Sequence, residues 1–273
     1  MRRKLKKKML RVTLFLFILG LISGSSIAKT VNNGTTHKKR ITVFLAGDST
    51  VSDYSISLAP RAGWGQVFNR FFDEKIVVKN EASSGRSSKS FIDEGRLESI
   101  LNQIEKGDYL FIQFGHNDEK IEDPTRYTKP HSTYKSYLKQ YIEGARAKQA
   151  IPVLVTPVER RSFSKGGIAR DTHSEYSTAM KELGLEENVP VIDLTSKSKA
   201  LFQVLGPERT KDVFLCLEAG ENDNYPNGVQ DNTHFQETGA EMISRLLIES
   251  IEELKLEPLR NHIFIYGDKY RQE

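Results

Sequence analysis

Short apolar runs rich in β-branched residues alternate along the chain with segments whose apolar residues recur at helical spacing. The runs predict five strands, at residues 41–47, 75–80, 109–115, 151–157 and 189–194. Three of these runs are nearly continuously apolar, which is typical of strands covered on both faces. The alternation over the whole length predicts one α/β domain with a mainly parallel, five-stranded sheet.

The C-terminal part combines a predicted helix with a long irregular stretch. Residues 240–254 carry an apolar stripe, and Thr238 with Glu241 has the pattern of a capping box. Residues 206–231 show no periodicity, and a stretch of that length is typical of a functional loop. Within it, the acid- and amide-rich residues 221–232 could bind calcium, but the spacing fits no EF-hand. We favour a solvated active-site loop there.

The first 28 residues have the layout of a secretory signal peptide. Seven Lys or Arg residues lie in residues 1–11, an apolar core follows at 12–22, and small residues stand near position 28. This core is too short to span a bilayer, which needs about 20 residues. We therefore expect a secreted protein without stable membrane insertion after cleavage, with an uncleaved anchor as the alternative. Polar residues 29–40 are expected to form a flexible lead-in to a single domain at 41–273.

Charge and cysteine content narrow the class of protein. Since seven of the 40 basic residues lie in the leader, the mature chain has 33 basic and 36 acidic residues, a formal net charge of −3. No basic stripe with interleaved aromatic residues is present, so nucleic acid is excluded as a partner. Cys216 is the only cysteine, and its apolar neighbours favour a small buried hydrophobe over a nucleophile.

Polar clusters follow three of the predicted strands at their carboxyl ends. GDST (47–50) follows the first strand, Gly85 and Arg86 lie just past the second, and GHND (115–118) ends the third. In open α/β sheets, ligands bind beyond the carboxyl ends of the strands. Each cluster alone could be a turn, but together they predict a functional site on this rim.

The residue types in these clusters fit acyl transfer. A serine nucleophile needs an imidazole to take its proton, a carboxylate to orient the imidazole and donors for the oxyanion. Ser49 is the candidate nucleophile and His234 the candidate base. Asp231, on an expected turn, can hydrogen-bond Nδ1 of His234 and leave Nε2 free for Ser49. A backbone N–H near Gly85 and the side-chain amide of Asn117 are the candidate oxyanion donors.

Asp48 is expected to shape the turn by a local hydrogen bond, because an acid adjacent to Ser49 is badly placed to reach His234. The sequence contains no Gly-x-Ser-x-Gly elbow, Walker loop, HExxH or paired CxxC motif. The remaining histidines are interpreted as surface or satisfied core residues: His37, His131, His173 and His262.

Together the clusters resemble blocks I, II, III and V of the SGNH (GDSL-type) hydrolases. The matching segments are Gly47–Thr50, Gly85, Gly115–Asp118 and Asp231–His234, and the match runs from about residue 41 to 255. Thr50 stands where the commonest form of the first block has leucine. The resemblance implies a flavodoxin-like, three-layer α/β/α fold, a serine esterase mechanism and no metal or cofactor. It gives the family's named roles to Ser49, Gly85, Asn117 and His234.

Longer segments resemble the rhamnogalacturonan acetylesterase branch of this family: AGDSTV, GWGQ, SSGRSS, QFGHND and DNTHF. The substrate that this branch implies is an acetylated pectin backbone, as polysaccharide or oligosaccharide. An acidic chain would be repelled by a protein of net charge −3, so a local cluster must attract it. An arginine can hold a carboxylate bidentately. The candidate substrate contacts are Arg86, His116, Trp64 and Arg160.

Alternatives remain for these contacts and for the function. Arg86 could instead pair with a neighbouring acid, and Trp64 could belong to the core. The enzyme could act on another ester, such as acetylated xylan, a lipid or a thioester, although the polar rim segments speak against a lipase. A non-catalytic carbohydrate-binding protein on this scaffold is a further alternative, but binding alone would need neither Ser49 nor His234.

Overall fold

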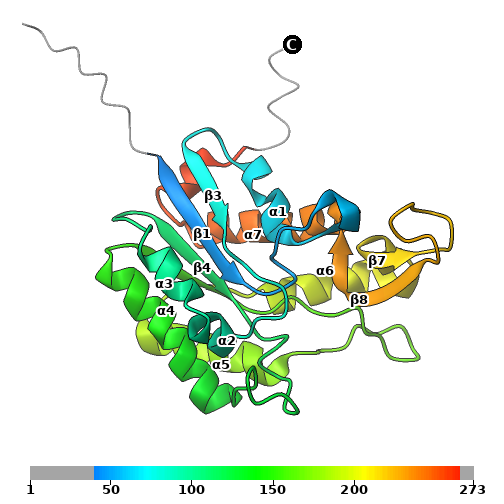
Figure 1. The fold of residues 1–273 in the computed structure, drawn as a ribbon, viewed down its shortest axis with the longest axis horizontal. Helices are drawn as coiled ribbons and strands as arrows, with labels where there is room; N and C mark the ends of the chain where they lie inside the picture. The colour runs from blue at the N-terminus through cyan, green and yellow to red at the C-terminus, as the bar shows by residue number, and fades with distance from the viewer. Residues whose placement is uncertain (1–39, 265–273) are drawn as a thin grey trace, which may run out of the picture. The chain divides into compact units, whose positions relative to one another are not determined.

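The computed structural model describes residues 40–264, so the predicted leader and nearly all of the lead-in lie outside the described residues. A five-stranded sheet in the order β3-β1-β4-β5-β6 forms the middle layer, and every neighbouring pair is parallel (Figure 1). Counted along the chain within this sheet, the order is the flavodoxin-like one, so the predicted fold class is confirmed. Its strands are β1 (Ile41–Gly47), β3 (Ile76–Asn80), β4 (Tyr109–Gln113), β5 (Ile151–Val155) and β6 (Val191–Ile192).

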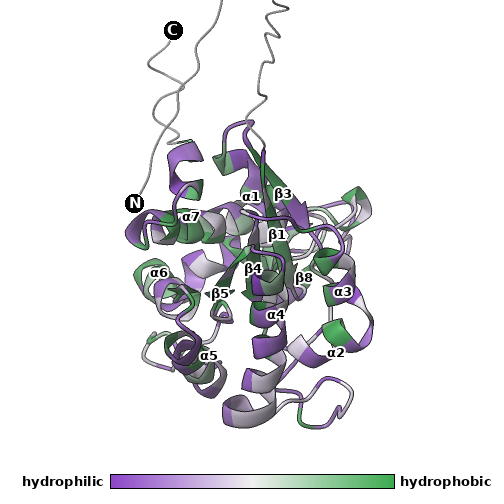
Figure 2. Ribbon diagram, turned by 90° about the vertical axis from the view of Figure 1, so that its left-hand side faces the viewer, coloured by the Kyte–Doolittle hydropathy of each residue, from purple (hydrophilic) through white to green (hydrophobic). Residues whose placement is uncertain are grey.

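Helices cover both faces of this sheet, because successive strand residues point to opposite sides. Val43 and Leu45 of β1 belong to one core, with α1, α6 and α7, whereas Phe44 and Ala46 belong to the other, with α2 to α5. Figure 2 shows the apolar strands between the helices. The helices are α1 (Trp64–Phe68), α2 (Ser88–Asp93), α3 (Arg96–Leu101), α4 (Lys135–Ala147), α5 (Ser174–Glu187), α6 (Leu194–Arg209) and α7 (Glu237–Glu253).

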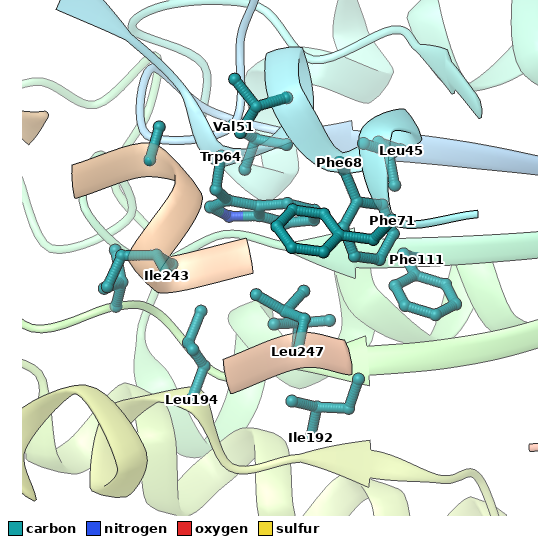
Figure 3. Packing of buried hydrophobic residues seen from close by; sticks show 14 of the residues in the cluster. Leu45, Val51, Trp64, Phe68, Phe71, Phe111, Ile192, Leu194, Ile243 and Leu247 are labelled. Carbon is teal, nitrogen blue, oxygen red and sulfur yellow. The ribbon is translucent and has the colours of Figure 1, made fainter. Parts of the chain in front are cut away.

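Trp64 is part of the first of these cores. Its side chain is 1% exposed, and its ring meets that of Phe68 edge to face at 5.3 Å. Figure 3 shows both rings packed near Leu247 of α7. The indole Nε1 donates to Gln113 Oε1 at 2.8 Å, which satisfies its one polar atom. The prediction that Trp64 contacts substrate is therefore wrong, and the core alternative holds.

The structure also contains a second, antiparallel sheet, in the order β2-β8-β7. The sequence patterns do not predict this sheet. Its strands are β2 (Arg61–Ala62), β7 (Phe214–Leu217) and β8 (Val229–Gln236). The prediction of an irregular loop over residues 206–231 is therefore wrong, since this stretch holds the end of α6, a 3₁₀ turn at Thr210–Asp212 and β7. The sequence of β8, VQDNTHFQ, lacks the alternation that marks a half-buried strand.

Cys216 lies on β7 and is partly buried against the first core, as the apolar pattern around it predicts. Burial raises the pKa of its thiol, which weakens it further as a nucleophile. No helix within residues 40–264 has the length and apolar character needed to cross a membrane.

Several predicted boundaries shift by a few residues. The third and fourth predicted strands each end two residues early, and only Val191 and Ile192 remain of the fifth. There the chain turns into α6, because the carboxylate of Asp193 caps that helix by accepting from the Ser196 N–H at 3.1 Å.

The predicted capping box of the last helix is absent. Because α7 already begins at Glu237, Thr238 lies inside its first turn and donates to the Asp212 carbonyl at 3.2 Å instead. Glu241 pairs with Arg70 at 2.6 Å. The start of the helix is thus held by side-chain contacts to other parts of the chain and not by a capping box.

Candidate active site

The turn after β1 presents Ser49 at the carboxyl end of the sheet. Asp48 is fully buried, and its Oδ1 accepts from the Thr50 N–H at 2.9 Å and the Thr50 hydroxyl at 2.8 Å. Gly47 is required here, since a Cβ would lie 2.6 Å from Val51 Cγ2. Burial opposes ionisation of Asp48, but its neighbour His116 and the bonds from Thr50 outweigh it and lower the pKa of the acid. Asp48 thus shapes the turn, as predicted.

Ser49, His234 and Asp231 form one hydrogen-bonded chain. His234 Nε2 lies 2.9 Å from Ser49 Oγ, and His234 Nδ1 lies 2.6 Å from Asp231 Oδ2. Because a carboxylate can only accept, Nδ1 carries the ring proton and Nε2 is left to accept from the serine hydroxyl. The structure therefore makes both hydrogen bonds that the sequence predicts.

The second sheet brings His234 to Ser49, although 185 residues separate them in sequence. β8 pairs with β2 directly after His234, with Phe235 opposite Ala62. The chain entering α1 is in turn tied to the serine turn, since the Trp64 N–H donates to the Thr50 carbonyl at 2.9 Å. The pairing of β8 with β2, which the sequence patterns do not predict, therefore places His234 within hydrogen-bond distance of Ser49.

Asp231 and His234 stand at an irregularity of β8, where the sequence predicts a turn. Leu215 and Phe214 are consecutive in β7, but their partners in β8 are Asp231 and Phe235. The residues between bulge out, so Asp231 Oδ1 accepts from the Thr233 N–H at 2.8 Å and the His234 N–H at 3.0 Å. Burial would raise the pKa of Asp231, but the bonds and charge of His234 and these N–H groups lower it to about 2.

Asn117 lies beyond β4 and is 5% exposed. Its Nδ2 donates to the Arg86 carbonyl at 3.0 Å, and its Oδ1 accepts from Arg126 Nη1 at 3.4 Å. A carbonyl can only accept and a guanidinium can only donate, so these two neighbours fix which way the amide points. One N–H of Asn117 remains for a ligand.

Gly85 adopts a φ of +82°, a conformation that glycine populates readily. A Cβ at this position would meet nothing within 4 Å. The glycine is therefore needed here for its backbone conformation. The sequence analysis predicts it for a different reason, the close approach of a ligand.

A cavity of about 240 Å³ joins these groups. Four cationic side chains line it, and within the described part of the chain no carboxylate does. Two of the cations are held by acids outside the lining: Arg160 by Glu119 at 2.5 Å and Arg126 by Asp123 at 2.6 Å. The lining residues are Ser49, Arg61, Ser84, Gly85, His116, Asn117, Lys120, Arg126, Arg160, Thr233 and His234.

Two predicted substrate contacts, Arg160 and His116, lie in this lining, but Arg86 does not. His116 is 3% exposed, and its ring centroid lies 4.3 Å from that of His173. Burial, chiefly, and the nearby His173 lower the pKa of His116. Arg86 pairs with Glu94 at 3.0 Å and donates to the Ser84 carbonyl at 2.8 Å, so the alternative of a local acid partner holds.

Three cations line the cavity although the sequence analysis does not predict them as site residues: Arg61, Lys120 and Arg126. Lys120 and Arg126 follow the GHND segment by a few residues, which is the one signal in the sequence that could have indicated them. Arg61 precedes the GWGQ segment, and its guanidinium lies 4.4 Å from the ring centroid of Tyr54. Among the described residues, neither Arg61 nor Lys120 is paired with a carboxylate.

The predicted active-site loop at 221–232 comprises part of the connection between β7 and β8 and the first residues of β8. Its residues Asn224 and Tyr225 contact the chain that leads to Arg61. Asn224 Nδ2 donates to the Ile56 and Ala59 carbonyls at 3.0 and 2.8 Å, and the Tyr225 hydroxyl donates to the Leu58 carbonyl at 2.9 Å. Over residues 40–264, no three His, Cys, Asp or Glu side chains group in a way that could hold a metal ion.

The other histidines that the structure describes have partners. His131 is exposed and lies 3.0 Å from Glu182, whereas His173 and His262 are buried, 2.9 Å from Glu119 and from Asp73 respectively. The interpretation as surface or satisfied core residues holds for His131 and His262, whereas Nε2 of His173 is buried without a hydrogen-bond partner among the described residues. His37 lies outside the described residues.

Comparison with known proteins agrees with this arrangement. Residues 45–242 match the GDSL-like lipase/acylhydrolase family. Rhamnogalacturonan acetylesterase RhgT of Bacillus subtilis is 51% identical over 226 residues, which cover 83% of this chain and 95% of the relative. Probable rhamnogalacturonan acetylesterase YesY of the same organism is 46% identical, over 81% of this chain and 96% of the relative.

A solved structure also matches this fold. The crystal structure of the B. subtilis protein YxiM superposes with a TM-score of 0.66 at 29% identity, over 80% of this chain and 58% of that one. The family match spans more than half of the sequence and includes all the residues that line the cavity. The chain therefore belongs to the GDSL-like lipase/acylhydrolase family and is a carboxylic ester hydrolase.

Proposed function

We propose that the protein is a secreted rhamnogalacturonan acetylesterase that works through an acetyl-enzyme formed on Ser49. The observation that carries this proposal is the chain Ser49–His234–Asp231, which opens onto a cavity lined by four cations. The names of RhgT and YesY support the substrate. The signal-peptide layout of residues 1–28 supports secretion.

In the proposed reaction, Ser49 Oγ attacks the acetyl carbonyl carbon while His234 Nε2 takes the hydroxyl proton. The oxyanion accepts hydrogen bonds from Asn117 Nδ2 and the backbone N–H of Gly85. The bond to the sugar oxygen then breaks, and His234 returns its proton to that oxygen. Water attacks the acetyl-enzyme with His234 again as base, which releases acetate and restores Ser49. Asp231 holds the ring in the required tautomer throughout.

The charge of the cavity favours an acidic polysaccharide over a neutral one. Galacturonate places a carboxylate on every second sugar of rhamnogalacturonan, and Arg61 and Lys120 are cations without an acid partner among the described residues. A neutral xylan or lipid ester would leave these charges facing an uncharged ligand. The test is acetate release from acetylated rhamnogalacturonan, homogalacturonan and xylan. We expect the highest kcat/KM for rhamnogalacturonan, and a preference for xylan would overturn the assignment.

Lys120→Ala should weaken selection for the acidic polymer. We expect the ratio of kcat/KM for acetylated rhamnogalacturonan to that for nitrophenyl acetate to fall about tenfold, because a charge-assisted hydrogen bond is lost. High salt should act in the same direction, since the screening length falls from about 10 Å at 0.1 M to about 3 Å at 1 M. Lys106→Ala, an exposed lysine outside the cavity, is the matched control. If salt and Lys120→Ala both leave the ratio at its wild-type value, the cavity does not select for carboxylates.

Asn117→Ala should lower kcat by about 10²–10³ with little change in KM, because the amide binds the oxyanion only as it forms. Initial-rate kinetics on nitrophenyl acetate measure both constants. The control is Asn102→Ala, an exposed asparagine at the end of α3. An effect confined to KM would instead assign Asn117 to binding of the ground state.

A further inference from the structure

A second cavity, of about 420 Å³, adjoins the catalytic one and shares Gly85 and Arg126 with it. We call it the side cavity; its remaining walls include Arg86, Asp93, Glu94 and Thr125. A third cavity, of about 280 Å³, shares Arg61 with the catalytic cavity and no residue with the side cavity. The catalytic cavity therefore adjoins a further cavity at Gly85 and Arg126 and another at Arg61, so there is room beside it for further parts of a larger ligand.

The side cavity differs from the catalytic cavity in charge. Its two cations stand beside two acids in the lining, Asp93 and Glu94. The cations are also engaged: Arg86 pairs with Glu94 at 3.0 Å, and Arg126 pairs with Asp123 at 2.6 Å. A carboxylate here would meet these acids without a free cation to offset them. Sugar hydroxyls, by contrast, can donate to a carboxylate in charge-assisted hydrogen bonds.

The walls of the side cavity are held in place before any ligand binds. A reciprocal capping box between Ser87 and Ser90 fixes the start of α2, with the Ser87 N–H 2.9 Å from Ser90 Oγ. Two further lining residues, Thr125 and Arg126, are held by Asp123, which accepts from the Thr125 N–H at 3.0 Å and from Arg126 Nε. Arg126 also reaches Asn117 Oδ1 at 3.4 Å, so the partition between the two cavities contacts the proposed oxyanion donor.

We propose that the side cavity is a subsite for an uncharged sugar residue, adjacent in the same polysaccharide chain to the residue whose ester enters the catalytic cavity. The proposal rests on the proposed function, because it presumes a saccharide ester as substrate. It assigns Asp93 to hydrogen bonds with the hydroxyls of this sugar and makes the enzyme selective for esters flanked by further sugars. An alternating acidic and neutral chain matches the charges of the two neighbouring cavities.

The test compares an acetylated rhamnogalacturonan tetrasaccharide with acetylated methyl galacturonoside, which has no neighbouring sugar. We expect the wild-type kcat/KM to be at least about tenfold higher for the tetrasaccharide, equivalent to about 1.4 kcal/mol. Asp93→Ala should remove most of this advantage, because it deletes the hydrogen-bonding carboxylate. Thr125→Trp should do the same by filling the cavity from an exposed turn. Glu98→Ala, an exposed acid on α3 outside the lining, is the matched control and should keep the wild-type ratio.

Equal kcat/KM values for the two saccharides in the wild type would overturn the subsite while leaving the acetylesterase function intact. A wild-type ratio retained by both Asp93→Ala and Thr125→Trp would also overturn it. If the wild type releases acetate from neither saccharide but hydrolyses nitrophenyl acetate, the proposed function itself fails, and the subsite fails with it.

Discussion

Ser49→Ala is expected to lower kcat by about 10³ or more while leaving the fold intact. The hydroxyl supplies the only nucleophile in the hydrogen-bonded chain with His234 and Asp231. Residual activity should come from oxyanion binding and substrate positioning alone. The fold should persist because the Ser49 hydroxyl makes no other hydrogen bond within the described residues, whereas Asp48 and Thr50 hold the turn through their own contacts.

Acetate release under saturating substrate measures this effect, and circular dichroism with thermal unfolding checks the fold. His234→Ala should cause a comparable loss, and the double variant should lose little more, because the two residues act as a unit. Ser99→Ala, an exposed serine on α3, is the matched control. Near wild-type turnover by Ser49→Ala would remove the basis of the proposed mechanism.

Asp231→Asn is expected to lower kcat by up to about 10⁴, the loss that the corresponding change causes in a serine protease triad. An amide at this position can donate to Nδ1 of His234, which favours the tautomer with its proton on Nε2 and leaves no acceptor for the Ser49 hydroxyl. Asp223→Asn, an exposed acid in the connection between β7 and β8, is the control. A nearly silent Asp231→Asn would mean that another group orients the ring.

The pH dependence of stability gives an independent check on Asp231. Its pKa in the folded protein is lowered from the usual 3.8 to about 2, so the fold favours the ionised form. The stabilisation is present above about pH 4 and is lost as pH falls toward 2. Acid unfolding of Asp231→Asn should therefore lack this contribution, so the stability difference from the wild type should shrink as pH falls through that window. A difference that stays constant would contradict the lowered pKa.

The central strands could be predicted from the sequence because burial on both faces leaves an unbroken apolar run, as in β1, β4 and β5. The second sheet could not, because β8 carries Asp231 and His234 among polar, mostly half-buried residues that show no alternation of apolar and polar positions. Periodicity therefore does not predict this sheet, although the sequence motif Asp-x-x-His within β8 indicates its functional residues.

Some residues of the candidate site could likewise be predicted from the sequence, and others could not. Ser49, Asn117, Asp231 and His234 stand in short motifs whose residue types fit one chemistry, so their meeting could be predicted without knowing which strands pair. The cations could not be sorted in this way, since only the folded chain decides whether an arginine meets an acid. Arg86 pairs with Glu94, whereas Lys120 lines the cavity without an acid partner in the described residues, and nothing in their sequence context separates them.

Labelling with a fluorophosphonate, followed by peptide mapping, tests the central claim most directly, because this reagent forms a covalent adduct only with an activated serine. We predict a single adduct on the peptide that contains Ser49, loss of esterase activity in proportion to labelling, and much slower labelling of His234→Ala. An adduct on a different serine, or full activity in protein labelled at Ser49, would contradict the account.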